Sequence, residues 1–441
     1  MKRLKYILFL SLCCPSAVAQ EAWTIDRCIA YSVQHSTPLH RQRIENIQHT
    51  ADERAAKQAF LPTIAAQMSG QYSWGRNINP ETNTYNTITT FNNYYNIGAE
   101  LTLFDGGRLL NSLRQARLIR SNNETLLAKL AEEKAIVIMN KFVEAIYNRK
   151  SVNLAERKLS DSKALLYKTQ RLYELGEKAR PDVVQMESQV AEDEFALLHQ
   201  QNEARTTLLA LKTEMNYPLS DTLVLDTCTV LLSDEKPTLG SLYNRFSTAS
   251  PKVRNAEFEV ENARYDYLIQ RTSRLPRLTL SVGISTNYFK SFNQGGYQGS
   301  GFFKQLSNNM GEYVAVSLSI PIFNPSIKNN IRKAETNWHL AQLALEETRQ
   351  KVEANIAQAL IDYDNCIQEI AQMNRKVAAD SVAYHLSFRK YEEGMLSTFD
   401  LQTSGQKLLT SRIHLLKLQM LAMIKQRILN YYKGDALWTS K

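Results

Sequence analysis

Residues 95–103 read YNIGAELTL, with apolar side chains at every second position and small or polar ones between them. The same alternation occurs in residues 278–285, LTLSVGIS, and in residues 316–322, VSLSIPI, while residues 63–74 form a weaker and more polar version. A period of two over about ten residues, with one apolar face, is typical of strands that cross a membrane as part of a barrel. The sequence therefore predicts four membrane strands per chain, in two pairs.

Long loops are expected between the strands of each pair, over residues 75–93 and 287–311, where Asn, Gly, Ser and aromatic residues are frequent. Within the second loop, residues 295–301 read GGYQGSG, which superficially resembles a phosphate-binding loop. That motif requires a strand before it and a helix after it, and this setting is missing here. We therefore expect a flexible loop.

Four strands are too few to close a barrel, because the smallest outer-membrane barrels use about 8. Unpaired strand edges cannot persist in lipid, where backbone groups find no water to bind. The sequence therefore predicts that several chains share one barrel. Three chains would give about 12 strands, although this argument alone does not fix the number.

The two halves of the chain share an ordered set of short motifs at a nearly constant spacing. Leu61-Pro62 corresponds to Leu275-Pro276, and the pattern Tyr-x-x-Gly-x5-Asp begins at Tyr173 and again at Tyr391. Ordered repetition of this kind indicates duplicated structure. It predicts a first structural repeat over residues 20–216, a linker over 217–236, a second repeat over 237–433 and a C-terminal tail over 434–441. Further matching segments are 23–25 with 237–239, 36–39 with 249–252, and 103–106 with 322–325.

Each half also predicts long helices. Residues 107–175 contain no proline and no glycine after Gly107, so one continuous helix of roughly 100 Å is expected at a rise of 1.5 Å per residue. Residues 327–393 predict a second long helix, and residues 24–60 and 182–216 predict shorter ones. The chain from Val152 to Tyr173 has a coiled-coil spacing, and its predicted seam consists of Val152, Ala155, Leu159, Ser162, Leu166, Thr169 and Tyr173.

Residues 1–19 have the features of a secretory signal peptide: three basic residues, a short apolar run and the cleavage sequence Ala17-Val18-Ala19. Cleavage would lower the formal net charge from +9 to +6, and the remaining chain has no basic block that would indicate nucleic-acid binding. Lipidation at Cys13 or Cys14 stays open, although Leu12 is bulky where a lipobox has a small residue. No later stretch has the 18 apolar residues that a transmembrane helix needs.

The sequence contains no motif that indicates catalysis, a cofactor or a metal site. HExxH, GxSxG and P-loop patterns do not occur. The three cysteines after the leader, Cys28, Cys228 and Cys366, show no CxxC or Cys/His ligand spacing, so buried free thiols are expected. The sequence predicts a protein that is not an enzyme.

Together, Leu61-Pro62 before a strand, the turn LFDGGR at residues 103–108 and the paired Tyr-x-x-Gly-x5-Asp motifs resemble the TolC-like outer membrane efflux proteins. This resemblance covers nearly the whole mature chain. It implies a mainly α fold with membrane β structure: a homotrimer that shares a 12-stranded β-barrel in outer-membrane lipid and forms a long α-helical barrel in the periplasm. The implied function is a passive exit duct of a tripartite efflux or type I secretion system, with a periplasmic adaptor protein and an inner-membrane pump as partners.

The resemblance places the turns after Tyr173 and Tyr391 at the periplasmic tip, where the helices close the entrance. Gly176 and Gly394 are expected to end the helices there, and Pro181 and Ser397 or Thr398 to start the returning ones. Asp182 and Asp400 then lie in first helical turns, where an acidic residue also favours the helix dipole. In a trimer, Asp400 would form an anionic ring that favours cations.

Some proteins of this kind carry an arginine where this chain has Leu396, and that arginine ties the closed tip to the first Asp. The sequence therefore does not determine which residues hold the tip closed in this chain, and Arg180 and Arg389 are the candidate ionic partners. Gly176, Gly394 and Leu396 mark the expected site of adaptor docking.

Two other classes of protein compete with the duct. A structural or adhesive coiled-coil protein of the envelope would explain the helical spacing but not the alternating segments. A hydrolytic enzyme would need a nucleophile and a base, for which the sequence has no motif. The cargo, the pump and adaptor, and the choice between drug efflux and protein secretion stay open at this point.

Overall fold

The structure, a computed structural model, describes residues 22–79, 83–226, 238–240, 242, 243, 246, 250–292 and 300–438. The predicted signal peptide, Cys228, half of the predicted linker and most of the glycine-rich loop lie outside these residues. The chain folds into two compact units. The sheet unit comprises residues 41–129 and 247–353, and the hairpin unit comprises the residues up to 40, 130–246 and those from 354 onward. Each unit contains segments of both predicted halves.

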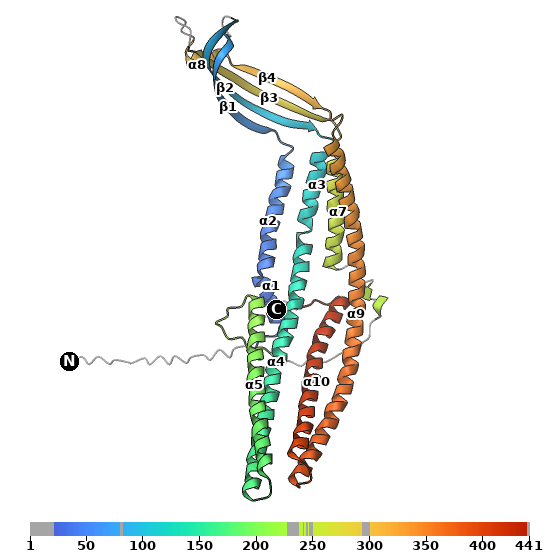
Figure 1. Ribbon diagram of the computed structural model, residues 1–441. Coiled ribbons are helices and arrows are strands. Elements are labelled where there is room, and N and C mark those ends of the chain that lie inside the picture. Colours follow the sequence, from blue (N-terminus) through green and yellow to red (C-terminus); the bar gives the residue numbers. More distant parts are fainter. Residues whose placement is uncertain are drawn as a thin grey trace, which may run out of the picture. The chain divides into compact units, whose positions relative to one another are not determined.

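The sheet unit is built on four antiparallel strands in the order β1-β2-β3-β4, which Figure 1 shows at one end of that unit. The strands are β1 (Thr63–Asn79), β2 (Thr84–Phe104), β3 (Arg277–Ser291) and β4 (Gly311–Ser319). The four predicted strands are thus confirmed. Sequential strands are neighbours, and each pair is joined at a fixed register, for example Ile97 opposite Ile284.

The predicted loop boundaries were wrong. β1 continues to Asn79, β2 begins at Thr84 and β3 continues to Ser291, so much of the two expected loops is strand. The extensions are polar but rich in Thr and Tyr, which fit a pleated ladder. At the other end, β4 stops at Ser319 although the alternation continues to Ile322. Pro321 has no backbone N–H to donate, so the ladder cannot continue through it.

The two faces of the sheet differ in character, as the alternation predicts. One face carries apolar side chains that are exposed in the single chain: Ile64, Met68, Ile97, Val282, Ile284, Val314, Val316 and Leu318. The registers place the small or polar residues on the other face, such as Gln67, Asn96 and Ser285. On that face Tyr313 lies across two glycines: a Cβ atom would be 3.0 Å from its hydroxyl oxygen at Gly98 and 2.7 Å at Gly283.

The short helix α8 (Phe302–Asn308) covers the edge of β3 beyond the end of β4. β4 pairs with β3 only as far as Ser285. Farther along β3, the side chain of Gln305 accepts a hydrogen bond from the backbone N–H of Phe289 at 3.0 Å, and Asn309 donates to the carbonyl of Asn287 at 2.9 Å. These bonds satisfy backbone groups that a longer β4 would otherwise pair.

Helical segments also belong to the sheet unit. They are α2 (Thr37–Gln58), α3 (Arg108–Ser121), α7 (Pro251–Thr272) and the first part of α9 (Pro325–Glu392). α7 contacts α3 through Gln115, which donates to Asn262 at 3.0 Å, and it contacts α9 through stacked Tyr267 and Trp338. Glu53 of α2 binds Arg120 of α3 at 2.6 Å. None of the helices in the described residues is both long and apolar enough to cross a membrane.

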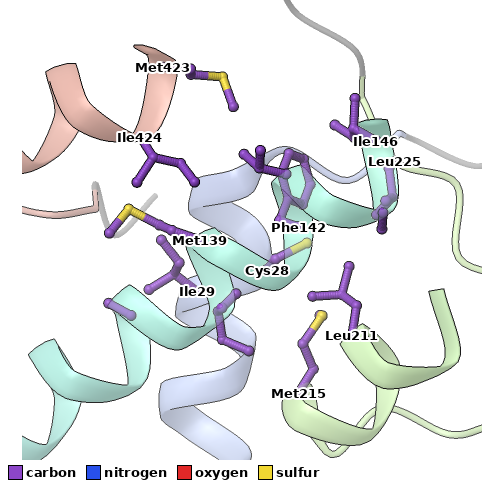
Figure 2. Packing of buried hydrophobic residues seen from close by; sticks show 14 of the residues in the cluster. Cys28, Ile29, Met139, Phe142, Ile146, Leu211, Met215, Leu225, Met423 and Ile424 are labelled. Atoms are coloured by element: carbon purple, nitrogen blue, oxygen red, sulfur yellow. The ribbon is translucent and has the colours of Figure 1, made fainter. Parts of the chain in front are cut away.

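The hairpin unit contains two helical hairpins. The first consists of α4 (Asn123–Glu174, from residue 130) and α5 (Arg180–Met215), and the second of α9 from residue 354 and α10 (Thr398–Lys433). The short helix α1 (Ile25–His35) also belongs to this unit. Its core gathers α1, α4, α5 and α10 (Figure 2). Among the residues that Figure 2 labels are Cys28, Ile29, Met139, Phe142, Leu211 and Ile424.

The predicted helices are confirmed with two corrections. The helix expected over residues 24–60 is divided at Ser36, whose backbone is extended, because Pro38 fits only the first turn of a new helix. The helix expected over residues 107–175 is divided at Asn122, whose ψ of −8° departs from helical geometry. The bonds from Asn122 to Leu118 and from Leu126 to Asn122 nevertheless keep the helical pattern across the division. α9 is continuous over 68 residues.

Two of the three cysteines are described, and both are buried free thiols, as predicted. Burial raises the pKa of Cys28 to about 12. Its thiol is therefore protonated at neutral pH and packs as a small apolar side chain.

Candidate functional site

The candidate site is the pair of turns that end the two hairpins. Gly176 and Gly394 adopt left-handed backbone conformations, with φ of 80° and 72°. After each glycine the chain closes the same bond: Glu177 donates to the carbonyl of Leu172 at 2.9 Å, and Met395 donates to that of Lys390 at 2.8 Å. This is the Schellman arrangement, in which a residue without a Cβ atom ends a helix. Both predicted helix ends are thus confirmed.

The returning helices begin as the sequence predicts. Ser397 is the N-cap of α10, and its hydroxyl oxygen accepts a bond from the N–H of Asp400 at 3.1 Å. Pro181 lies in the first turn of α5, where its missing N–H costs nothing. The carboxylate of Asp182 accepts a bond from the N–H of Ala179 at 3.3 Å. The carboxylate of Asp182 therefore caps its own helix, whereas Ser397 caps the helix of Asp400.

The two predicted tyrosines occupy different environments. Tyr391 is 1% exposed, and its hydroxyl oxygen lies 2.8 Å from that of Thr169 on α4. The ammonium group of Lys178 lies 4.6 Å from the centre of the Tyr391 ring, a favourable cation–π position. Tyr173 is 42% exposed. Tyr391 thus joins the second hairpin to the first, whereas Tyr173 faces outward.

The two predicted aspartates also differ. Asp182 accepts a hydrogen bond from the hydroxyl of Thr398 at 3.0 Å, which joins α5 to α10. Asp400 is exposed, and its carboxylate accepts a bond from Ser397 on its own helix at 2.6 Å. Asp182 therefore holds the two hairpins together, whereas Asp400 remains accessible from outside the chain.

The ionic partners proposed from the sequence do not form the contact between the hairpins. Arg180 and Arg389 are exposed, and in the described part of the chain neither has an ion-pair partner. Leu396 is half-buried. The ion pair that joins the hairpins at the turns is Lys168 with Glu392, at 2.6 Å. Sequence reasoning missed it because the pairing depends on how α4 and α9 are aligned, which no local motif indicates.

Exposed apolar side chains surround the turns. Leu175, Met395 and Phe399 are all about two-thirds exposed in the single chain, and a Cβ atom at Gly176 or Gly394 would meet open space. Apolar side chains at a loop tip are suited to contact with another protein. Within the described ranges, no group of three or more His, Cys, Asp or Glu side chains could hold a metal ion.

The model of the outer membrane efflux protein family matches residues 242–430, a range that includes the second turn with Tyr391, Gly394 and Asp400. This part of the chain is therefore similar to that family. The pyoverdine export outer membrane protein OpmQ of Pseudomonas aeruginosa is 24% identical over 303 residues, which cover 66% of this chain and 59% of that relative's length.

Solved structures show the same fold. The outer membrane protein VceC of Vibrio cholerae matches with a TM-score of 0.77 at 17% identity, over 94% of this chain and 96% of that one. The MtrE outer membrane channel of Neisseria gonorrhoeae, solved in its open state, matches with a TM-score of 0.72 at 18% identity, over 94% and 89%. The chain therefore has the same fold as these two solved outer-membrane proteins.

Proposed function

We propose that this protein is the outer-membrane exit duct of a tripartite efflux or type I secretion system, and that it works as a homotrimer without catalytic activity. The observation that carries the proposal is the four-stranded sheet, which has an exposed apolar face and ends in β1 and β4. Each of these edge strands pairs with one neighbour in the described chain. Such edges need partners before the apolar face can enter lipid.

An even number of antiparallel strands supports closure between copies. β1 and β4 run in opposite directions, because three antiparallel pairings separate them. The β4 strand of one copy can therefore pair with β1 of the next in the same antiparallel sense as every other ladder. Three copies in a closed ring would form a barrel of about 12 strands, which lies within the range of known outer-membrane barrels.

The turns of the two hairpins are proposed as the periplasmic gate. Three contacts support a closed arrangement of the hairpins: Tyr391 with Thr169, Asp182 with Thr398, and Lys168 with Glu392. Asp400 is exposed beside them, and three copies would supply the predicted anionic ring. The exposed apolar residues Leu175, Met395 and Phe399 support docking of a periplasmic adaptor at these turns, through which an inner-membrane pump would supply the energy.

The test is single-channel recording in a planar bilayer, with detergent-purified wild-type protein, Asp400→Ala and a control, Asp221→Ala. Asp221 is also an exposed aspartate, but it follows α5 and lies in neither turn. We expect discrete cation-selective openings in wild type and control. In a salt gradient, the reversal potential of Asp400→Ala should move toward zero.

Two results would count against the proposal. An unchanged reversal potential in Asp400→Ala would contradict the anionic ring but not the duct. Protein that neither trimerises nor inserts into the bilayer would contradict the duct itself and favour a structural coiled-coil protein of the envelope.

A further inference from the structure

A buried polar cluster joins the two helices of the first hairpin. Ser162 of α4 donates a short hydrogen bond to the carboxylate of Asp193 on α5. Lys158, one turn before Ser162, places its ammonium group 3.8 Å from the same carboxylate. Gln189 donates to the other carboxylate oxygen at 3.0 Å. Asp193 and Ser162 are 5% and 3% exposed, so the carboxylate is largely shielded from solvent.

The second hairpin contains a cluster of the same composition. Ser411 of α10 donates a short hydrogen bond to the carboxylate of Asp380 on α9. Lys376, one turn before Asp380, contacts both the carboxylate at 2.6 Å and the hydroxyl of Ser411. Hydrogen bonds from Lys376 and Ser411 lower the pKa of Asp380, so its carboxylate is ionised at neutral pH.

The two clusters occupy equivalent positions with two residue types exchanged. The spacing that relates Tyr173 to Tyr391 also relates Lys158 to Lys376, Ser162 to Asp380 and Asp193 to Ser411. The lysine is therefore on the outgoing helix in both hairpins. The serine and the aspartate have changed places between the outgoing and the returning helix. The bond from hydroxyl to carboxylate is kept, although its direction across the hairpin is reversed.

Such a cluster fixes the register of two packed helices. A charge-assisted hydrogen bond is stronger than a neutral one, and a buried carboxylate that loses its partners is strongly destabilising. If one helix slid along the other by a turn, the buried carboxylate of Asp193 would lose its bond to Ser162. The carboxylate of Asp380, which is half-buried, would lose its bond to Ser411. A single polar position in a coiled coil is known to specify register in this way.

The contacts between the hairpins are weaker. At the turns they comprise neutral or singly charged hydrogen bonds and the exposed pair of Lys168 with Glu392, and exposed ion pairs contribute little to stability. Nearer the clusters, Gly405 of α10 is approached from both hairpins: a Cβ atom there would lie 3.3 Å from the ring of Tyr384 on α9 of the same hairpin and 3.6 Å from the ammonium group of Lys158 on the first hairpin.

We propose that the two Lys-Ser-Asp clusters are register locks, which keep each hairpin rigid while the gate opens by movement between the hairpins. This inference rests on the proposed gate, and it assigns Lys158, Ser162 and Asp193, with Lys376, Asp380 and Ser411, as positioning residues. Opening then separates Tyr391 from Thr169 and leaves both locks closed.

The test is amide hydrogen exchange on the purified full chain, read by mass spectrometry on peptides of α4, α5, α9 and α10. Asp193→Ser removes the first lock. Ser162→Asp/Asp193→Ser rebuilds it in the arrangement that the second hairpin already uses. The control is Glu194→Ser, which removes the exposed pair of Glu194 with Lys163 between the same two helices.

We expect exchange in α4 and α5 on the turn side of the lock to rise at least tenfold in Asp193→Ser. In the double variant Ser162→Asp/Asp193→Ser, the exchange rate should return to within about twofold of the wild-type rate. The exchange rate of Glu194→Ser should not differ from that of wild type. Asp380→Ser should show the same rise confined to α9 and α10, reversed by Asp380→Ser/Ser411→Asp. Equal exchange rates in Asp193→Ser and Glu194→Ser would contradict the proposal that the clusters are register locks. A double variant that exchanges as fast as the single variant would contradict it as well.

The link to gating has its own readout. Tyr391→Phe should raise the fraction of time that the channel is open in a bilayer without raising exchange around either lock. If exchange around the locks rises together with opening, the hairpins do not move as rigid bodies and the inference is wrong. If the protein forms no channel but shows the expected exchange pattern, the duct proposal and the gating role fail, whereas the locks themselves stand.

Discussion

The hydroxyl of Tyr391 donates to that of Thr169 across 2.8 Å, and both side chains are fully enclosed by the protein. The direction follows from the second bond of Thr169, whose own hydroxyl lies 2.9 Å from the carbonyl oxygen of Leu165 and donates to it. This bond joins α9 to α4, and therefore one hairpin to the other, next to the turns. Water cannot replace it while the hairpins are together.

Removing this bond should loosen the closed turns. Tyr391→Phe keeps the ring and its packing but deletes the donor, at an expected cost of about 1 kcal/mol. We expect a lower melting temperature by circular dichroism and more frequent openings in a bilayer. Tyr173→Phe is the matched control, because Tyr173 lies at the equivalent position and is exposed. Equal effects of the two substitutions would show that the buried bond has no special role.

Gly394 should be intolerant of a side chain although space is available. Its φ of 72° is left-handed, and a Cβ atom would meet nothing within 4 Å. Gly394→Ala is therefore expected to cost about 1–2 kcal/mol from backbone strain alone. Thermal unfolding would measure this cost, with the neighbouring exposed Glu393→Ala as control. A stability equal to that of the control would mean that the turn can adopt another conformation.

Gly283 should be sensitive for the opposite reason, because its surroundings are crowded. A Cβ atom there would lie 2.7 Å from the hydroxyl oxygen of Tyr313 and 2.8 Å from the carbonyl oxygen of Ile97. The carbonyl belongs to the β2 backbone and cannot move away without disturbing the ladder. We expect Gly283→Ala to reduce the yield of folded, heat-resistant protein on electrophoresis. Gly311→Ala, where space is open, should behave like wild type.

Glu53 should make the protein more sensitive to acid. Hydrogen bonds from Lys57 and Arg120 lower its pKa from 4.5 to about 2. Because the ionised form is favoured in the folded protein, this stabilisation is complete above pH 4.5 and is lost as the pH falls toward 2. The Glu53→Gln variant should therefore be less stable than wild type at neutral pH. As the pH falls from 4.5 toward 2, it should lose less stability than wild type does.

The measurement is the thermal midpoint of the helical signal across this pH range. The control is Glu257→Gln, which removes an exposed pair with Arg349 in the same unit. Parallel curves for wild type and Glu53→Gln would contradict the assignment.

The sequence predicts this fold well wherever a short-range pattern determines it. Alternation in residues 95–103 and 278–285 identifies strands, because side chains in a strand point to opposite faces in turn. Gly176 and Gly394 mark helix ends, because few other residues adopt a positive φ. Ser397 marks a helix start, because its side chain supplies the missing acceptor. In each case the physical cause lies within a few residues.

Features that depend on packing were not predicted. The strand between Thr84 and Asn93 is polar on both faces, and the neighbouring strands rather than its own pattern hold it in the sheet. Ser162 was expected only as one position in a coiled-coil seam, yet its bond to Asp193 depends on the alignment of α5. The exchange of Ser and Asp between the hairpins also hides the duplication, since aligned positions carry different residues.

The sheet has a consequence for the order of folding. β2 pairs with β3, although the whole of the α4–α5 hairpin separates them along the chain, whereas each helical hairpin brings together residues that are close in sequence. Closing a long loop costs more entropy than closing a short one, and distant strand pairings form slowly. We therefore expect the hairpins to form first, the β2–β3 ladder later, and the pairing of edge strands between copies last, in a step whose rate depends on protein concentration.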